Sequence, residues 1–317
     1  MAPPPAMTSV APPRVAVGPE PAPFAVDAVT AGGGQVVPLG EEADALVWLS
    51  PRPEDNELLR HALAEGPGIR WVQLPFAGIE HVVAAGIVDA ERAWTCAKGS
   101  YAEPVAEHAL MLAMAGLRLL PARIRATSWG EQAGTSLYDA PVTILGGGGI
   151  TQELIRLLTP LRAEVTVVRR RPDPVPGAAR TVAADRLHDA LPGALVVFLA
   201  LALTPATERV IGRRELERMD ERAWLVNVAR GRHVDTGALV AALAAGAIAG
   251  AALDVTDPEP LPDGHPLWSA PNCIITPHSA DTWEMVRPLL AARIRENVAR
   301  FRAGQPLEGT VDPAAGY

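Results

Sequence analysis

The segment 141–171, which reads PVTILGGGGITQELIRLLTPLRAEVTVVRRR, limits the fold class of this chain more than any other. The apolar run 142–145 is typical of a buried strand, the glycines 146–149 of a tight turn, 150–161 of a helix, and 165–168 of a second strand. A strand, a crossover helix and a second strand form a βαβ unit, whose two strands run parallel. We therefore predict an α/β protein with a doubly wound parallel sheet.

The glycine turn also predicts a phosphate site. A turn of this kind presents the amide N–H groups and the positive dipole end of the following helix to a pyrophosphate. The candidate cofactor-binding residues here are Gly146, Gly148, Gly149 and Ile150. The third glycine of a G-x-G-x-x-G pattern is replaced by Thr151, whose hydroxyl could cap the helix or reach a phosphate.

The end of the second strand indicates which dinucleotide binds. About 20 residues after the glycines, an acidic residue normally holds the ribose 2′-hydroxyl of NAD. This chain has Arg169 and Arg170 there. An acid would repel a 2′-phosphate, whereas a guanidinium binds one as a fork. The pattern favours NADP, with NAD possible; the alternative is an exposed basic loop end.

Three further apolar runs, 223–226, 249–253 and 273–275, are each followed by polar residues that suit one chemistry. Arg230, Glu259 and His278 follow these runs, and ligands of open α/β sheets bind beyond the carboxyl ends of the strands. A guanidinium binds a carboxylate, and an imidazole transfers protons near neutral pH. A neighbouring carboxylate raises the pKa of the imidazole. Each residue alone could be an ordinary loop residue, but together they predict a site that protonates a 2-oxo acid as hydride arrives.

The segments NVARGRHVD, DVTDPEPLP and TPHSA resemble the signature segments of the D-isomer-specific 2-hydroxyacid dehydrogenases, and most of 70–310 shares the resemblance. The glyoxylate/hydroxypyruvate reductases are the relatives we expect. The resemblance implies that Arg230 binds substrate, that His278 is the general acid/base and that Glu259 supports His278. Formate dehydrogenases of this fold have Gln in place of the glutamate, so Glu259 argues against that activity. A dinucleotide-sensing corepressor of the same fold stays open, because such a protein could keep all three residues.

The resemblance extends to other residues. It implies that the backbone of Ala77 and Gly78 holds the substrate carboxylate, and that Asp254 contacts the nicotinamide carboxamide. Lys98, the only lysine, follows a strand and is a candidate substrate contact. His108 is expected to be structural. The remaining candidate cofactor contacts are Thr204, Val228, Ala229, Ala280 and His278.

With 317 residues the chain is long enough for two domains. Strand candidates at 14–17, 45–49, 69–74 and 94–97 predict a small α/β domain. We expect two Rossmann-like domains with a cleft between them. Residues 1–101 and 284–317 would form a discontinuous substrate domain, and 102–283 the dinucleotide-binding domain.

Composition narrows the partners and the compartment. The net charge of −8 argues against nucleic acid, and two cysteines in apolar runs predict buried free thiols. The sequence has neither a membrane span nor the charged start of a secretory signal, which predicts a cytoplasmic protein. We expect no metal site. The apolar helix 103–120 must be buried on several sides, and the resemblance implies that this segment contributes to a homodimer interface.

Overall fold

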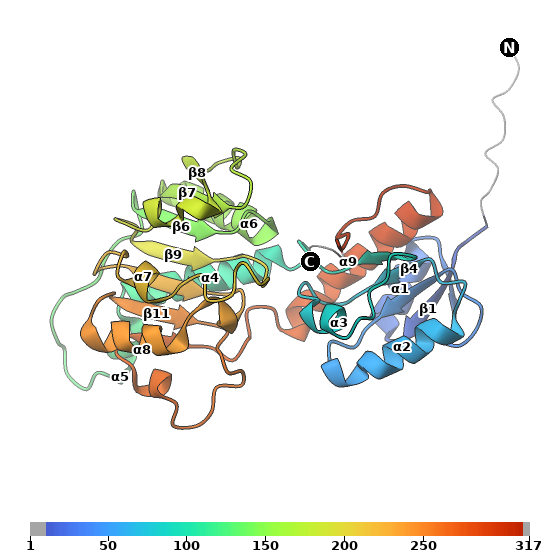
Figure 1. Cartoon of the computed structure of the whole chain (residues 1–317), viewed down its shortest axis with the longest axis horizontal. Coiled ribbons are helices and arrows are strands. Elements are labelled where there is room, and N and C mark those ends of the chain that lie inside the picture. The colour runs from blue at the N-terminus through green and yellow to red at the C-terminus, as the bar shows by residue number, and fades with distance from the viewer. Residues whose placement is uncertain (1–10, 313–317) are drawn as a thin grey trace, which may run out of the picture. The chain divides into compact units, whose positions relative to one another are not determined.

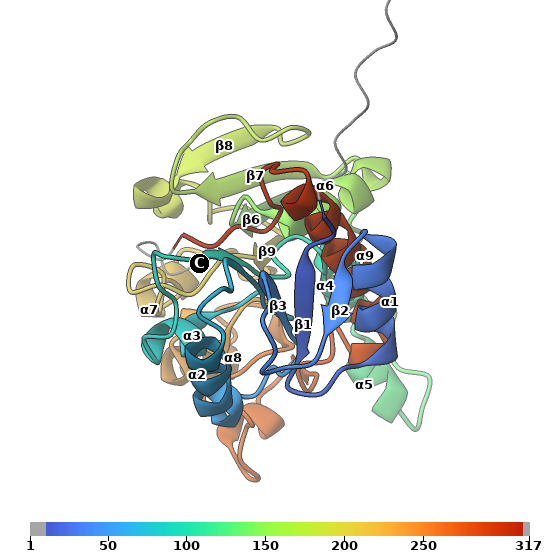
Figure 2. The ribbon, with the colours of Figure 1, turned by 90° about the vertical axis from the view of Figure 1, so that its right-hand side faces the viewer.

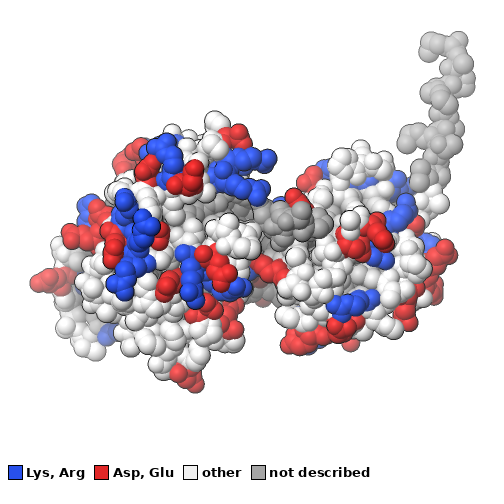
Figure 3. Space-filling model, viewed as in Figure 1, with Lys and Arg blue, Asp and Glu red and all other residues white. Residues whose placement is uncertain are grey.

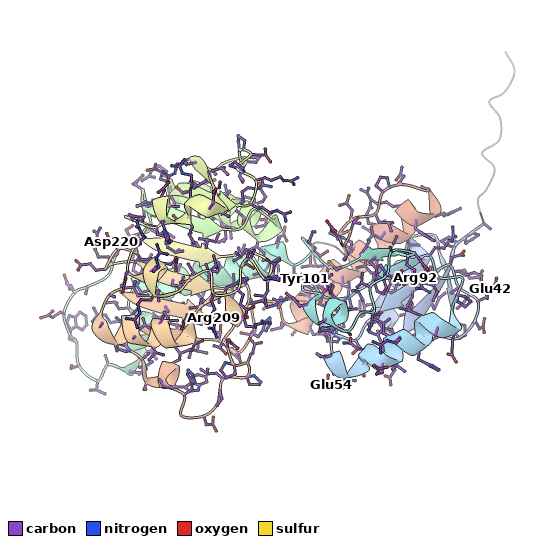
Figure 4. All side chains as sticks on the ribbon, in the orientation of Figure 1. Glu42, Glu54, Arg92, Tyr101, Arg209 and Asp220 are labelled. Carbon is purple, nitrogen blue, oxygen red and sulfur yellow. The ribbon has the colours of Figure 1, made fainter. Side chains whose placement is uncertain are left out.

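The computed structural model describes residues 11–312, which divide into two compact units. The first unit holds the residues up to Ser100 and those from Trp283 onward, and the second is Tyr101–Thr282. Tyr101, the first residue of the second unit, is labelled in Figure 4. None of the described helices combines the length and the apolar character needed to cross a membrane.

The second unit is built on seven parallel strands in the order β12-β11-β10-β9-β6-β7-β8. Strand order extends in both directions from β6 and β9, and the predicted doubly wound parallel sheet is confirmed. Most of the central strand residues are buried apolar side chains, as a sheet covered on both faces requires. The strands are β6 (Pro141–Leu145), β7 (Glu164–Arg169), β8 (Arg180–Ala183), β9 (Val196–Leu199), β10 (Trp224–Asn227), β11 (Gly250–Leu253) and β12 (Cys273–Ile275).

Helices cover both faces of this sheet. Helix α4 (Ala102–Leu117) packs against α6 (Gly149–Leu158), β10 and β11, whereas α7 (Arg213–Leu216) packs against α8 (Thr236–Ala245). In Figure 1, α4 lies behind the strands and α8 in front of them. Asp235 caps α8 by accepting a hydrogen bond from the Ala238 amide, and left-handed Gly246 ends that helix. Short 3-10 turns complete the unit: η2 (Thr159–Leu161), η3 (Ala184–Asp189), η4 (Gly231–His233) and η5 (Pro266–Ser269).

The first unit has a five-stranded parallel sheet in the order β2-β1-β3-β4-β5. Its strands are β1 (Arg14–Gly18), β2 (Gln35–Val37), β3 (Ala45–Trp48), β4 (Trp71–Gln73) and β5 (Ala93–Thr95). Figure 2 shows α1 and α9 on one side of these strands and α2 and α3 on the other. The helices are α1 (Pro23–Ala31), α2 (Asn56–Glu65), α3 (Glu80–Ala84) and α9 (Trp283–Arg302), with η1 (Pro53–Asp55) before α2.

A buried polar network holds α9 and the following chain on this sheet. Asn297 donates one amide hydrogen bond to Gln73 Oε1 at 2.9 Å and another to the Glu308 carbonyl. Thr95 donates to the same Gln73 oxygen, and the Trp71 indole donates to Thr95. Since the buried amide groups have partners, the network fixes the C-terminal segment without leaving a polar group unsatisfied.

Several predicted features differ from the observed ones. The expected helix 103–120 ends at Leu117, because Leu119 has a left-handed backbone (φ 54°), and α5 (Leu120–Arg125) starts a new direction. Within the apolar run 195–203, strand β9 covers only Val196–Leu199. Of the two cysteines, Cys96 is buried but Cys273 is only partly buried; both are free thiols.

Candidate active site

The predicted functional residues of the second unit lie at the carboxyl-terminal edge of its sheet. All seven strands are parallel, so the loops that follow them meet at one edge. The glycine turn follows β6, and Arg169 ends β7. The other strand ends bring Arg170 (β7), Thr204 (β9), Val228, Ala229 and Arg230 (β10), Asp254 and Glu259 (β11), and His278 and Ala280 (β12) to the same edge.

His278 and Glu259 form a hydrogen-bonded pair at this edge. His278 Nδ1 lies 2.6 Å from Glu259 Oε1, and Glu259 Oε2 accepts a hydrogen bond from the Thr256 amide at 3.2 Å. Both side chains are partly exposed, at 44% for His278 and 39% for Glu259. With Nδ1 engaged by the carboxylate, Nε2 is the ring atom through which His278 can exchange a proton with a substrate.

Electrostatics favours a charged pair. The hydrogen bond to Glu259 raises the pKa of the His278 imidazole, against the opposing effects of burial and of the Arg230 charge. Burial favours the neutral acid form of Glu259, but the hydrogen bond from His278 and the nearby cations outweigh it and lower the pKa of Glu259. The pair is therefore held as imidazolium and carboxylate over a wider pH range than isolated groups would be.

Arg230 is half-buried on the loop after β10, where Asn227 shapes the backbone. The Asn227 side chain donates to the Arg230 carbonyl at 2.8 Å and accepts from the Ala229 amide at 3.0 Å. Arg230 donates from Nη1 to the Ala229 carbonyl. The positive charge of Arg230 lowers the pKa of both members of the His278–Glu259 pair. The guanidinium is therefore close enough to both side chains to influence their protonation.

Gly231 lets the loops after β10 and β11 approach closely. A Cβ atom at Gly231 would lie 1.9 Å from the Thr256 carbonyl oxygen and 2.6 Å from the Asp257 nitrogen. No side chain fits in that space. The contact fixes Arg230 relative to the segment that leads to Glu259.

Asp254 is buried and organises the backbone around His278. Its carboxylate accepts hydrogen bonds from the Thr276 hydroxyl at 2.6 Å and from the Ser279 and Ala280 amides at 2.9 and 3.1 Å. Burial raises the pKa of a carboxyl group, yet these hydrogen bonds and one from His108 outweigh burial and lower the pKa of Asp254 to about 2. Asp254, which was predicted to contact the cofactor, therefore also fixes the backbone around His278 as a buried carboxylate.

Asp281 lies near the candidate acid/base, and the sequence reasoning did not name it. It follows the TPHSA segment directly, and burial raises the pKa of its carboxyl group. The charges of His278, Asp254 and Arg230 all act on it. Its position three residues after His278 is the only signal that could have identified it.

The glycine turn has the geometry that a dinucleotide pyrophosphate needs. Gly146 has φ +117°, and a Cβ there would lie 2.1 Å from the Ala200 carbonyl oxygen, so only glycine fits. A Cβ at Gly148 would meet no atom within 4 Å, so the backbone there is open to a ligand. The Arg169 side chain packs over the turn: a Cβ at Gly147 would lie 3.1 Å from Arg169 Nε. These residues fit a dinucleotide.

Thr151 does not cap α6, the first of the two roles considered for it. Its hydroxyl is buried without a hydrogen-bond partner, and α6 has no side-chain cap.

The buried side chain of His233 supports the turn at Thr204, which follows β9. The Thr204 amide donates to Thr207 Oγ1 at 2.8 Å. The fully buried ring of His233 places Nδ1 2.9 Å from the Thr207 carbonyl and Nε2 3.2 Å from the Leu201 carbonyl. His233 thereby joins both ends of the turn to the loop that carries Arg230, a role the sequence reasoning missed.

The predicted substrate contacts of the first unit lie together at the carboxyl-terminal edge of its own sheet. The turn with Ala77 and Gly78 follows β4, and Lys98 follows β5. The Ala97 amide donates to the Phe76 carbonyl at 2.9 Å, which joins the two loops. Lys98 is exposed, and Arg293 donates to its carbonyl. Between residues 11 and 312, no group of three or more His, Cys, Asp or Glu side chains is placed to hold a metal.

Comparison with known proteins agrees with this geometry. Residues 108–280 match the family described as "D-isomer specific 2-hydroxyacid dehydrogenase, NAD binding domain". The chain is 39% identical over 295 residues (91% of this chain, 95% of the relative) to an uncharacterized protein from the proB 3′ region of Corynebacterium melassecola. It is 30% identical over 253 residues (77% of each chain) to human glyoxylate reductase/hydroxypyruvate reductase.

A solved structure has the same fold over nearly the whole chain. The D-isomer specific 2-hydroxyacid dehydrogenase from Xanthobacter autotrophicus Py2, in complex with NADPH and MES, matches with a TM-score of 0.84 and 27% identity. The match covers 97% of this chain and all of that one. The protein is therefore a member of the D-isomer specific 2-hydroxyacid dehydrogenase family, an NAD(P)-dependent oxidoreductase.

Proposed function

We propose that the protein reduces a small 2-oxo acid, such as glyoxylate or hydroxypyruvate, to the D-2-hydroxy acid, with His278 as the acid/base. The observation that carries the proposal is the His278–Glu259 pair, 2.6 Å apart, at the sheet edge that also holds Arg230 and the glycine turn. The human relative at 30% identity is named for glyoxylate and hydroxypyruvate, which supports this substrate class.

The bound cofactor supplies the hydride, and the protein's side chains supply the rest of the chemistry. Arg230 binds the substrate carboxylate as a fork and orients the carbonyl. His278 donates a proton from Nε2 to the carbonyl oxygen, and Glu259 keeps the ring charged and oriented through Nδ1. In the oxidative direction, neutral His278 accepts that proton from the hydroxyl group.

The two units receive different roles in this proposal. Tyr101–Thr282 binds the dinucleotide, because it contains the glycine turn and the family match. The other unit binds substrate, through the backbone of Ala77 and Gly78 and through Lys98. The preferred cofactor is NADPH, since the Arg169 side chain packs over Gly147 beside the pyrophosphate turn and replaces the acid that NAD-binding proteins carry.

The proposed assembly is a homodimer. The segment α4–α5 and the loop after it expose Met111, Met114, Leu120, Ile124, Trp129 and Tyr138. We call these six residues the apolar arm surface. Ile124 is 75% and Trp129 93% exposed, which is unusual for side chains of this size in a monomer. Basic and acidic side chains are interspersed on the face of the units shown in Figure 3.

A cofactor and substrate screen tests the function. Purified protein is assayed with glyoxylate, hydroxypyruvate and pyruvate, each with NADPH and NADH, and His278→Asn is assayed in parallel. We expect turnover with at least one 2-oxo acid that is lost in the variant. Cofactor binding without turnover of any of them would overturn the proposal and favour a dinucleotide-sensing binding protein of the same fold.

A further inference from the structure

We propose that His108 is a positioning residue for this reaction: through Asp254 and Thr276 it holds the loop 276–280 that carries His278. The inference rests on the proposed role of His278 as acid/base. It gives a function to a histidine on α4 whose described contacts, with Thr276 and Asp254, include none of the predicted catalytic residues.

The hydrogen-bond geometry around His108 allows one arrangement. His108 Nε2 lies 3.0 Å from Thr276 Oγ1 and 3.2 Å from Asp254 Oδ1. The Thr276 hydroxyl donates its proton to Asp254 Oδ1 at 2.6 Å, so Thr276 can only accept from His108. His108 therefore carries a proton on Nε2 and shares it between the hydroxyl and the carboxylate.

Asp254 links His108 to the loop 276–280 by hydrogen bonds. Its carboxylate accepts the Ser279 and Ala280 amides, and its carbonyl accepts the His278 amide at 2.8 Å. The loop needs these hydrogen bonds, because His278 has a left-handed backbone (φ 49°) that a non-glycine residue adopts at a cost. Without its His108 donor, the buried carboxylate would be less well satisfied and the loop less well fixed.

The charged groups around His108 and His278 determine how the pKa of His278 should respond to a change at His108. His108 faces Asp254, and no other charged side chain is among its described contacts. His278 faces Glu259, Arg230 and Asp281. If the loop loosens, His278 moves from Glu259, and the support that raises its pKa weakens.

Two substitutions of His108 distinguish the loss of its hydrogen-bond donor from the loss of the imidazole ring alone. His108→Gln places an amide N–H near the position of Nε2 and keeps a donor without a charge, whereas His108→Leu removes the donor. His61→Leu is the control, because His61 is an exposed histidine on α2 that pairs only with Glu65 among the described residues. We expect His108→Leu to lower kcat roughly tenfold to a hundredfold, as small misplacements of reacting groups do. The KM for the 2-oxo acid should change less, and His108→Gln should recover most of kcat.

The decisive readout is the titration of His278 itself. With ¹³Cε1-labelled histidine, the His278 signal is assigned by its absence in His278→Asn, and its pKa is followed by NMR. We expect the pKa of His278, and the alkaline limit of 2-oxo acid reduction, to fall in His108→Leu but not in His108→Gln or His61→Leu.

The outcomes distinguish this inference from the proposed function. An unchanged His278 titration in His108→Leu overturns the inference, even if that variant has a lower melting temperature. A lowered His278 pKa in a protein that turns over no 2-oxo acid overturns the proposed function and leaves the coupling of His108 to the loop intact.

Discussion

At the residue scale, the imidazole of His278 is expected to provide most of the proton-transfer catalysis. The ring nitrogen Nδ1 is hydrogen-bonded to Glu259, and the His278 backbone amide donates to the Asp254 carbonyl. We predict that His278→Ala lowers kcat by about two to four orders of magnitude, the usual contribution of general acid–base catalysis. Steady-state kinetics at saturating cofactor measures this. Turnover close to that of the wild type would mean that another group transfers the proton.

In the proposed mechanism, Glu259 sets the pH range in which His278 can act. The hydrogen bond to Glu259 raises the pKa of His278, so reduction, which needs the protonated ring, persists to higher pH than an isolated histidine allows. In Glu259→Gln the anion is lost, the pKa of His278 falls, and the proton donor is lost at lower pH. We therefore predict that the alkaline limb of the kcat/KM profile moves to lower pH. An unmoved limb would argue against the pairing.

The sequence could identify some of these residues and not others. Arg230, Glu259 and His278 follow short apolar runs, and a parallel sheet necessarily brings such positions to one edge. His108 could not be found that way, because it lies within a helix and its partner Asp254 is far away in the sequence. The unpartnered hydroxyl of Thr151 likewise depends on packing depth, which a motif does not encode.

At the element scale, the contact between the loops after β10 and β11 depends on the missing side chain of Gly231. We predict that Gly231→Ala destabilises the protein by about 1–3 kcal/mol, the usual cost of overpacking, and lowers kcat. The added Cβ would displace the Thr256 carbonyl and with it the approach to Glu259. Urea unfolding measures the stability. Gly237→Ala in α8 is the control, since a Cβ there meets only Asp235 Oδ1 at 3.5 Å.

The end of β7 is expected to decide the choice of cofactor. A guanidinium facing the 2′-phosphate contributes a charge-assisted contact of about 1.5–3 kcal/mol. That corresponds to about one to two decades in the ratio of kcat/KM for NADPH and NADH. We predict that Arg169→Asp reverses the preference, although Arg170 could retain part of it. Arg214→Asp on α7 controls for net charge. A wild type that already prefers NADH would contradict this interpretation of the arginine pair.

The element boundaries show where sequence patterns lose information. Hydrophobicity continues through 103–120, but the helix turns at Leu119 because of a backbone conformation that the apolar pattern does not report. The run 195–203 is apolar throughout, yet the sheet register pairs only Val196–Leu199 with both neighbouring strands. Apolar runs indicate burial, and the hydrogen-bonded partner decides where a strand ends.

At the scale of the whole molecule, the parallel architecture was partly predictable, because a βαβ unit makes its two strands parallel. Neighbouring apolar runs could then be added to the same sheet, and the strand-end residues followed. The order of the strands, with β12 at one edge and β8 at the other, depends on long-range pairing, which the sequence does not state. The sequence could therefore place the strand-end residues at one edge more easily than it could give the contacts that support them.

We expect the protein to form a homodimer in solution. The apolar arm surface exposes Ile124 and Trp129, and a second copy of this chain is the partner we propose for it. We predict a dimer at micromolar concentration in sedimentation experiments, and a monomer after Ile124→Glu, because a charge cannot be buried in an apolar interface without a partner. Leu58→Glu on α2 is the matched control: Leu58 is also exposed, but it lies outside the arm surface, so this variant should remain dimeric. A wild-type protein that sediments only as a 33.3 kDa species would contradict the proposed dimer, and a dimer that survives Ile124→Glu would place the interface elsewhere.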